Sequence, residues 1–378
     1  MTTTASPAPS TPRPHRVAVI FGGRSTEHAI SCVTAGSVID ALTSAGYDVV
    51  PIGIARDGRW VLESRDPAAL RISEQGALPE VTTDGTGLVL APGGNLVALD
   101  AGDLPAELSE VDVVFPVLHG PWGEDGTIQG LLELADVRYV GSGVLASAVG
   151  MDKHAMKLHL MAQGLPVLPY AVITERTWET DRAAAREPVA SLGFPVFVKP
   201  ARGGSSIGIS KVGSLEELDE AVELARQHDP KVLVEAAAVD ARELECGVLG
   251  GFGHDAPEAS VVAEIVVEGD HEFYDFAAKY LPDEGSRLDV PADLPDDVAQ
   301  EARELAVRAF DAMECEGLAR VDFFWLPDGR LVINEINTMP GFTPSSMFPR
   351  MWAATGVDYP ALVDRLVRLA AARSTGLR

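Results

Sequence analysis

The sequence predicts a protein with an open α/β N-terminal domain followed by two α+β domains, and three observations support this. Its 378 residues suggest two or three domains of roughly 150 residues each. Over the first 140 or so residues, short apolar runs typical of buried strands alternate with segments of helical periodicity, which favours a mostly parallel sheet. The rest of the chain mixes strands, helices and a hairpin, which indicates α+β units.

Composition excludes several classes of function. Hydrophobic residues make up 46% of the chain and charged residues 23%, an ordinary balance for a globular protein. Lys and Arg total 30 against 56 Asp and Glu, and this net charge of −26 disfavours nucleic acid and anionic membranes as partners. No apolar run reaches the roughly 18 residues that span a bilayer, and the N-terminus lacks the apolar stretch of a signal peptide. We therefore expect a cytoplasmic protein.

The cysteines predict neither a disulfide framework nor a zinc site. Cys32, Cys246 and Cys315 are widely spaced and form no CxxC pair. We expect each to be a small buried hydrophobic residue.

The predicted N-terminal sheet carries two glycine-bearing loops at strand ends. A strand at 16–21 runs into a glycine turn, and a helix at 26–45 and a strand at 49–54 follow. A second apolar run, 111–118, ends in the turn-rich loop 119–126. Ligands of open α/β sheets bind at the carboxyl ends of strands, where both loops fall.

Two strands near the C-terminus, joined by a turn at 327–329, place polar residues on one face. If the turn has two residues, Asp322 faces Glu335 and Arg320 faces Asn337. Opposed carboxylates are tolerated where a cation lies between them, and Asp, Glu and Asn supply the oxygen ligands that Mg²⁺ prefers. A solvated face of an acidic protein explains the alternation equally well, and a three-residue loop would shift the register.

A glycine-rich loop at 202–208 follows a predicted strand that ends in Lys199. Its backbone amides and the hydroxyls of Ser205 and Ser206 are suited to phosphate oxygens, although the Walker pattern is absent. Lys153, which begins a predicted helix, adds a second cation, and in so acidic a protein an ATP site requires such local cations. The alternative is a plain surface hairpin.

Other polar residues at strand ends and in loops have ordinary explanations when taken singly. A carboxylate at the start of a helix acts as a cap, and a tyrosine in a long loop anchors it. The irregular segment 268–294 is long enough to suggest a function. The residues concerned are Glu27, His119, Glu235, Glu243, Lys279 and Tyr280.

Eight segments, in order from Arg16 nearly to the C-terminus, resemble the D-alanine:D-alanine ligases of the ATP-grasp superfamily. They are FGGRSTEHAIS (21–31), HGPWGEDG (119–126), MDKHAMK (151–157), FVKPARGGSSIGISK (197–211), RELECGVLG (242–250), FYDFAAKY (273–280), GLARVDFF (317–324) and NEINTMPGFTPSSMFP (334–349).

The resemblance implies an ATP-grasp fold in which ATP is held between the sheets of the second and third domains. The implied division is a flexible tail at 1–15, a substrate-binding domain at 16–141, a central domain at 142–239, and a C-terminal domain at 240–378 that carries a mobile lid at 268–294.

The implied activity is the ATP-dependent joining of two D-alanines for peptidoglycan precursor synthesis. Phosphoryl transfer to the first carboxylate gives an acyl phosphate, which the amine of the second D-alanine attacks, because direct amide formation in water is uphill. ATP and Mg²⁺ are implied, with two metal ions and Mn²⁺ as a substitute. Family members are commonly homodimers, and the apolar helix segment 30–42 is a candidate interface.

The resemblance assigns roles around the nucleotide. Mg²⁺ would be bound by Asp322, Glu335 and Asn337. Phosphates would be contacted by Lys153, Lys199 and Lys279, with Ser206 in the same site. The ribose would be held by Glu243 and the adenine edge by Glu235.

The resemblance also assigns roles around the amino acids. Glu27 and His119 would bind the first D-alanine, and Glu27, Ser205 and Tyr280 would close the lid and position the attacking amine. Arg320 and the Gly341 amide would stabilise the oxyanion, and Ser346 and the Met347 amide would hold the second carboxylate.

The resemblance implies that the tyrosine at position 280 goes with an amine nucleophile, and hence with the dipeptide rather than D-alanyl-D-lactate. The alternatives are a ligase for D-lactate or D-serine, and a non-catalytic ATP-binding regulator. An NAD oxidoreductase fits least, because Gly22 and Gly23 are not followed by the expected third glycine. The eight-residue spacing of Glu235 and Glu243 is one longer than the family pattern, and residues 62–108 match nothing diagnostic.

Overall fold

The computed structural model describes residues 15–64, 66–72, 76–98, 110–204, 207–267 and 286–376. Four predicted site residues lie outside this range: Ser205, Ser206, Lys279 and Tyr280. Most of the predicted lid lies outside it as well. Within the described ranges, no helix has the length and hydropathy needed to cross a membrane.

The N-terminal part contains the predicted open sheet, with strand order β3-β2-β1-β6-β7. Its parallel strands are β1 (Arg16–Gly22), β2 (Asp48–Ile54), β6 (Val113–Pro116) and β7 (Arg138–Tyr139), and β3 (Trp60–Leu62) joins antiparallel at the edge. β1 is buried along nearly its whole length, as expected for a strand covered on both faces. The mostly parallel sheet is therefore confirmed.

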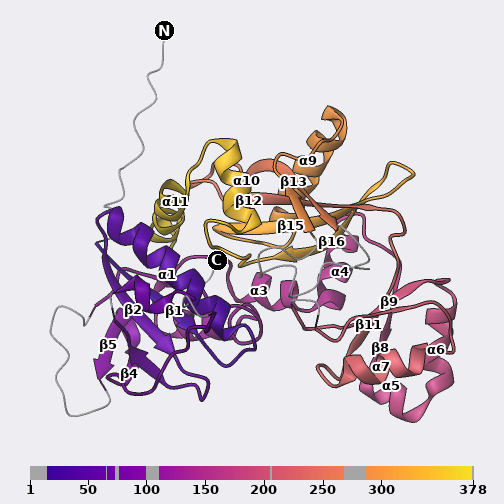
Figure 1. Ribbon diagram of the computed structural model, residues 1–378, viewed down its shortest axis with the longest axis horizontal. Helices are drawn as coiled ribbons and strands as arrows, with labels where there is room; N and C mark the ends of the chain where they lie inside the picture. Colours follow the sequence, from indigo (N-terminus) through magenta and orange to yellow (C-terminus); the bar gives the residue numbers. More distant parts are fainter. Residues whose placement is uncertain are drawn as a thin grey trace, which may run out of the picture.

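Helices cover this sheet, and one of them comes from the far end of the chain. They are α1 (His28–Ser44), α2 (Thr127–Leu134) and α11 (Tyr359–Ala372). α1 and α11 lie side by side (Figure 1), with Val38, Ile39 and Leu42 almost fully buried in the core that they share with β1. These apolar residues are therefore buried within the chain itself, and a subunit interface at segment 30–42 stays a prediction.

The segment without diagnostic matches contains a small hairpin, β4 (Leu88–Ala91) with β5 (Asn95–Ala98). Two short 3-10 turns, Pro67–Leu70 and Pro92–Gly94, lie in the same region.

The middle of the chain forms an antiparallel sheet with strand order β10-β9-β11-β8. The strands are β8 (Tyr170–Ile173), β9 (Val196–Pro200), β10 (Ser210–Val212) and β11 (Val232–Ala236), and the helices packed on them are α5 (Glu175–Thr180), α6 (Arg182–Ala190) and α7 (Leu218–Arg226). α7 alternates buried and exposed residues with helical spacing, so its apolar stripe faces the sheet.

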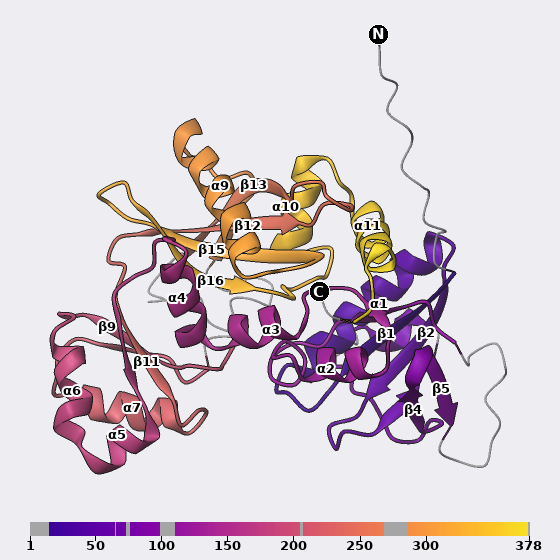
Figure 2. The same cartoon turned by 180° about the vertical axis from the view of Figure 1, so that it is seen from behind.

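The last third forms a second antiparallel sheet with strand order β14-β13-β12-β15-β16. The strands are β12 (Arg242–Leu249), β13 (Glu258–Val267), β14 (Ser286–Asp289), β15 (Leu318–Trp325) and β16 (Leu331–Asn337). α9 (Asp296–Ala312) and α4 (Lys153–Ala162) share one apolar core with one face of this sheet, whereas α10 (Met347–Thr355) packs with residues of the other face. α3 (Val144–Met151) leads from the first sheet into α4 beside β16 (Figure 2).

The hairpin of β15 and β16 has the predicted pairs but not the predicted turn. Asp322 pairs with Glu335 and Arg320 pairs with Asn337, as expected. The turn has three residues, 327–329, because Leu326 bonds to Arg330. A β-bulge restores the register: Phe323 pairs with Ile333, so Asn334 is the extra residue. The prediction of a two-residue turn is therefore wrong, and the bulge compensates for it.

Candidate functional site

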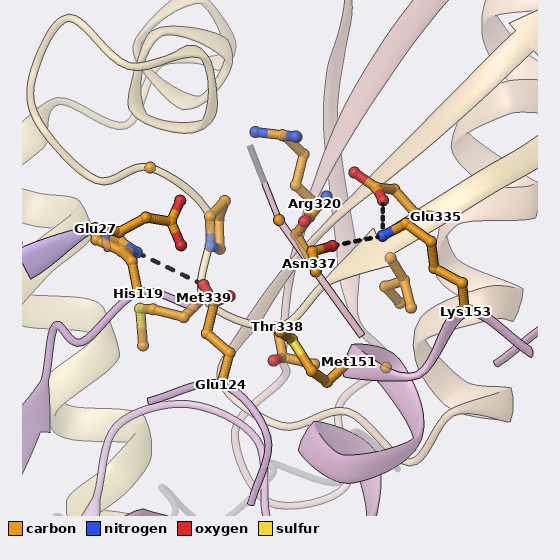
Figure 3. A pocket seen from close by; sticks show the side chains of 16 residues that line it. Glu27, His119, Glu124, Met151, Lys153, Arg320, Glu335, Asn337, Thr338 and Met339 are labelled. Atoms are coloured by element: carbon orange, nitrogen blue, oxygen red, sulfur yellow. Dashed lines mark hydrogen bonds and ion pairs between the residues drawn. The ribbon is translucent and has the colours of Figure 1, made fainter. Parts of the chain in front are cut away.

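A cavity of about 630 Å³ lies between the middle and C-terminal sheets. Lys199 and Glu235 line it from the middle sheet, and Glu243, Asp322 and Glu335 line it from the C-terminal sheet. Its size is within the usual range for a small-molecule site. A smaller pocket continues from it toward the N-terminal domain, with Glu27 and His119 at its far end (Figure 3).

Three polar residues on one face of the β15–β16 hairpin form a connected group with Glu245 of β12. The Arg320 guanidinium donates two hydrogen bonds of 2.7 Å to the Asp322 carboxylate and contacts Glu245 at 3.1 Å. The Asn337 amide donates to Asp322 at 3.0 Å. Although burial disfavours the charge, the carboxylates of Asp322 and Glu245 raise the pKa of Arg320 well above its usual value. The predicted metal-binding carboxylates thus lie together, next to a permanent cation.

Lys153 connects this hairpin to the glycine-rich loop. It is the first residue of α4, which the Asp152 side chain caps. Its ammonium lies 2.9 Å from the Glu335 carboxylate and donates to the Gly203 carbonyl at 3.1 Å. Burial opposes the charged form, but Glu335, Glu235 and Asp322 together raise the pKa of Lys153. The lysine therefore stays charged at the point where phosphates are expected.

A buried ion cluster lies deeper in the cavity. Glu235 Oε2 is 2.6 Å from Lys199 Nζ, and Glu235 Oε1 is paired with Lys157 Nζ. Burial alone would raise the pKa of Glu235, but the two lysines lower it. Burial lowers the pKa of Lys157 in spite of its carboxylate partner. The Glu235 carboxylate, predicted to contact adenine, is thus bonded to two cations here; the adenine contact stays a prediction.

The base of the glycine-rich loop is fixed by ion pairs. Arg202 donates to both carboxylate oxygens of Asp229, at 2.7 and 3.0 Å. Lys231, the residue before β11, pairs with Asp152 at 2.7 Å and so links the start of this strand to the start of α4. These contacts hold the backbone on which Gly203 and Gly204 approach the pocket.

At the N-terminal end of the pocket, Glu27, His119 and Glu124 lie close together (Figure 3). His119 Nδ1 is 3.6 Å from Glu124 Oε1, and Nε2 lies 3.3 Å from the Thr34 hydroxyl. Burial would lower the pKa of His119, but the hydrogen bond and charge of Glu124, together with Glu27, raise it. Gly120 has a φ of +74° and allows Glu27 to approach its Cα closely.

The predicted contacts for the second amino acid lie at the start of α10. Gly341 lines the pocket, and a Cβ on it would be 3.3 Å from the Ser346 hydroxyl. That hydroxyl accepts from the Thr343 amide at 3.1 Å. Met347 begins α10, where backbone amides lack partners within the helix and favour an anion.

Sequence reasoning missed three charged residues of the site: Lys157, Glu124 and Glu245. Lys157 lies four residues after Lys153, which puts both on one face of α4. Glu124 belongs to the same turn as His119, and Glu245 pairs with Asp322 across β12 and β15. The spacing of these residues in the sequence therefore contained a signal for Lys157 and Glu124. Glu245 could be found only by knowing which strands are neighbours in the sheet.

The hairpin residues fit a divalent cation. In the part of the chain that the structure describes, no group of three or more His, Cys, Asp and Glu is arranged to hold a metal. A metal at this hairpin would take oxygen atoms from Asp322, Glu335 and Asn337, with phosphate and water oxygens completing its shell. Such a donor set suits Mg²⁺, which usually keeps few protein ligands.

The three cysteines are buried, as expected from the sequence. Cys32, Cys246 and Cys315 are free and buried. Burial raises the pKa of each thiol to about 12, so they are unreactive hydrophobic residues, as predicted.

Comparisons with known proteins agree over nearly the whole chain. Models described as D-ala D-ala ligase N-terminus and C-terminus match residues 16–142 and 160–368. Proteins named D-alanine–D-alanine ligase are 58% identical in Paenarthrobacter aurescens (98% of each chain) and 60% identical in Kineococcus radiotolerans (98% of this chain, 100% of that one).

Solved structures agree as well. VanG D-Ala:D-Ser ligase from Enterococcus faecalis has a TM-score of 0.79 at 34% identity, covering 94% of this chain and 99% of its own. The D-alanine-D-alanine ligase from Coxiella burnetii has a TM-score of 0.78 at 32% identity, covering 95% and 94%.

Proposed function

Since this chain belongs to the D-alanine–D-alanine ligase family, we propose that it joins two D-alanines to D-alanyl-D-alanine at the expense of ATP, for peptidoglycan precursor synthesis. One observation carries the proposal. Two lysines and two carboxylates from separate elements line the cavity between the two antiparallel sheets, and the Asn337 amide lines the adjoining pocket. Catalysis of phosphoryl transfer depends mainly on such positioning and charge neutralisation.

The nucleotide occupies this cavity in our proposal. Lys153 and Lys199 neutralise phosphate charge, and Gly203 and Gly204 line the same cavity. Glu243 at the rim of the cavity holds the ribose. Mg²⁺ held by Asp322, Glu335 and Asn337 would offset the charge that develops on the phosphates. When the triphosphate binds, the Lys153 ammonium weakens its ion pair with Glu335 and contacts a phosphate oxygen. We propose two such ions.

The first D-alanine binds at the N-terminal end of the pocket. The Glu27 carboxylate is suited to its ammonium group, and His119 lies beside Glu27. The carboxylate of this D-alanine then points toward Arg320 and the phosphates. It accepts the γ-phosphoryl group of ATP to give an acyl phosphate and ADP.

The second D-alanine attacks the acyl phosphate. Its amine forms the amide bond, inorganic phosphate leaves, and the amine loses a proton. Arg320 and the Gly341 amide stabilise the oxyanion of the tetrahedral intermediate. Ser346 and the Met347 amide hold the carboxylate of the second D-alanine at the start of α10. Four further residues complete the site in this proposal and lie outside the described residues: Ser205, Ser206, Lys279 and Tyr280.

The proposal is tested by incubating the protein with ATP, Mg²⁺ and D-alanine. Equal amounts of phosphate and D-alanyl-D-alanine are expected. Phosphate release without dipeptide, or neither product, would overturn it. Competition between D-alanine, D-serine and D-lactate as second substrates separates the dipeptide ligase from its relatives. We expect D-alanine to be preferred, and its advantage over D-lactate to grow as pH rises because an amine nucleophile must be deprotonated. ATP binding without turnover would indicate a regulator.

The domain boundaries, a homodimer in solution and a cytoplasmic location belong to the same proposal. Sedimentation of the purified protein tests the second of these: a mass near twice 40.0 kDa is expected.

A further inference from the structure

The most buried charged side chain of the site has no role in the function described so far. The Lys157 side chain is 0% exposed, although it carries an ammonium group at the end of a long flexible chain. Buried ammonium groups are costly, and an apolar side chain of similar length would stabilise the core better. Stability alone therefore does not explain a lysine at this position.

The partners of Lys157 lie on two different sheets. On the middle sheet its ammonium is paired with Glu235, whose other oxygen binds Lys199 at 2.6 Å. On the C-terminal sheet it donates to the backbone carbonyl of Asn334 at 3.4 Å. Asn334 is the extra residue of the β16 bulge, the feature that brings Glu335 opposite Asp322.

Lys153 makes the corresponding contacts one helical turn earlier on α4. It binds the Gly203 carbonyl of the glycine-rich loop and the side chain of Glu335. Lysines at positions i and i+4 share one face of a helix. Together they bind two neighbouring residues of β16. Lys153 contacts the side chain of Glu335, and Lys157 contacts the backbone carbonyl of Asn334.

We propose that Lys157 is a positioning residue of the nucleotide site, whose buried ammonium fixes Glu235 and the Asn334 bulge and so places Lys199 and Glu335 against the triphosphate and its metal. The inference rests on the proposed function, since it assigns the residues around ATP. Lys157 also leaves the buried cluster with one positive charge in excess, because two lysines share a single carboxylate. That excess favours a polyanionic ligand.

The test compares Lys157→Met and Lys157→Gln with the unmodified protein. Both variants should fold, because they leave a neutral Lys199–Glu235 pair in the core. Calorimetric titration with ADP and Mg²⁺ should show weaker nucleotide binding, and a higher Mg²⁺ concentration should be needed for half-maximal binding. We expect kcat/KM for ATP to fall about 100-fold, the loss typical of misplaced groups, while KM for D-alanine changes little.

Leu160→Ala is the matched control, since Leu160 is fully buried on the same helix and carries no charge. It should lower the melting temperature and leave nucleotide and Mg²⁺ affinity within about threefold, because its cavity affects packing alone. Nucleotide affinity and Mg²⁺ response unchanged in both Lys157 variants would overturn the inference, as would an equal loss in Leu160→Ala. If only Lys157→Gln folds, its titration with ADP and Mg²⁺ decides the test. If neither variant folds, the role of Lys157 is structural and the inference is wrong.

Failure of the proposed function gives a different result. In that case the unmodified protein forms no dipeptide, whatever its affinity for ADP. Active unmodified protein together with unaffected Lys157 variants would refute the inference and leave the proposed function standing.

Discussion

The carboxylates of Asp322 and Glu335 lie directly opposite each other on β15 and β16, and a single extra residue, Asn334, makes this pairing compatible with a buried sheet face. On the turn side of the bulge, Leu331 and Ile333 are buried in the apolar core. Strict alternation would have placed Ile333 and Glu335 on the same face. The bulge therefore lets one short strand serve the core at one end and the polar site at the other.

Insertion of a glycine after Asn334 should impair ligation and destabilise the fold. Ordinary alternation through the longer strand would place Glu335 opposite Arg320 instead of Asp322, and keeping the observed pairs would require a larger bulge. We expect dipeptide formation to fall at least about 100-fold and the melting temperature to decrease, measured by product assay and thermal unfolding.

A glycine inserted after Gly329 serves as the control for chain length. The turn is exposed and Gly329 already has a positive φ of +87°, and exposed turns tolerate insertions. Activity close to that of the unmodified protein is expected. Full activity with the glycine after Asn334 would contradict the role given to the bulge.

The hairpin also shows how far sequence reasoning reached. Alternation correctly indicated that Asp322, Glu335, Arg320 and Asn337 share a face, because this depends on local geometry alone. The turn length was wrong, since Pro327-Asp328-Gly329 is compatible with two-residue and three-residue loops. The bulge at Asn334 had no signal in the sequence, because it is fixed by contacts with a helix about 180 residues earlier.

Prediction from the sequence had similar limits in the rest of the fold. The parallel N-terminal strands and the helices with strong periodicity, such as α11, were predictable from their patterns. α10 was not predicted, because its short sequence mixes apolar residues with a proline. The buried cluster of Lys157, Glu235 and Lys199 requires α4, β9 and β11 to be neighbours, which residue spacing does not reveal.

Glu335→Gln should separate metal binding from folding. The amide keeps the shape of the side chain but removes the charge that Lys153 contacts at 2.9 Å. We expect kcat to fall about 100-fold or more and the Mg²⁺ requirement to rise, as measured by activity against Mg²⁺ concentration.

Asp328→Asn on the same hairpin is the control for this prediction. Asp328 is half-exposed and pairs only with Arg330 in the described contacts, so the Mg²⁺ response should stay unchanged. Equal responses in both variants would argue against a metal at Glu335.

Gly120→Ala should weaken binding of the first D-alanine. A Cβ at Gly120 would lie 2.4 Å from Glu27 Oε2, and the φ of +74° is strained for any residue with a side chain. Displacement of Glu27 should raise KM for D-alanine about tenfold or more, equivalent to roughly 1.4 kcal/mol, and leave KM for ATP unchanged.

Gly164→Ala provides the comparison for backbone strain alone. Gly164 has a φ of +69° with no atom within 4 Å of the added Cβ. Both variants should lose stability of about 1–2 kcal/mol, but only Gly120→Ala should affect D-alanine binding. Matching KM values in the two variants would show that the Glu27 contact is unimportant.

Glu124→Gln should reverse the pH dependence of stability that His119 contributes. In the unmodified protein the pKa of His119 is raised, chiefly because the bond and charge of Glu124 outweigh burial. A raised folded-state pKa means that protonated His119 stabilises the fold below its unfolded pKa of about 6.5, and that this contribution is lost as pH rises through the folded pKa. Burial also raises the pKa of Glu124, which acts in the same direction, because the folded state again binds the proton more tightly.

In Glu124→Gln the raising effect of this carboxylate is gone, and burial, the largest single effect, outweighs the weaker charge of Glu27, so the pKa of His119 should fall below its usual value. The variant then loses stability on acidification, since its unfolded state takes up the proton first. The difference in melting temperature between the two proteins should be largest near about pH 5 and shrink toward about pH 8. Titration of the His119 ring protons by NMR measures the shift itself. A His119 pKa that is unchanged in Glu124→Gln would show that Glu124 does not hold this histidine in its charged form.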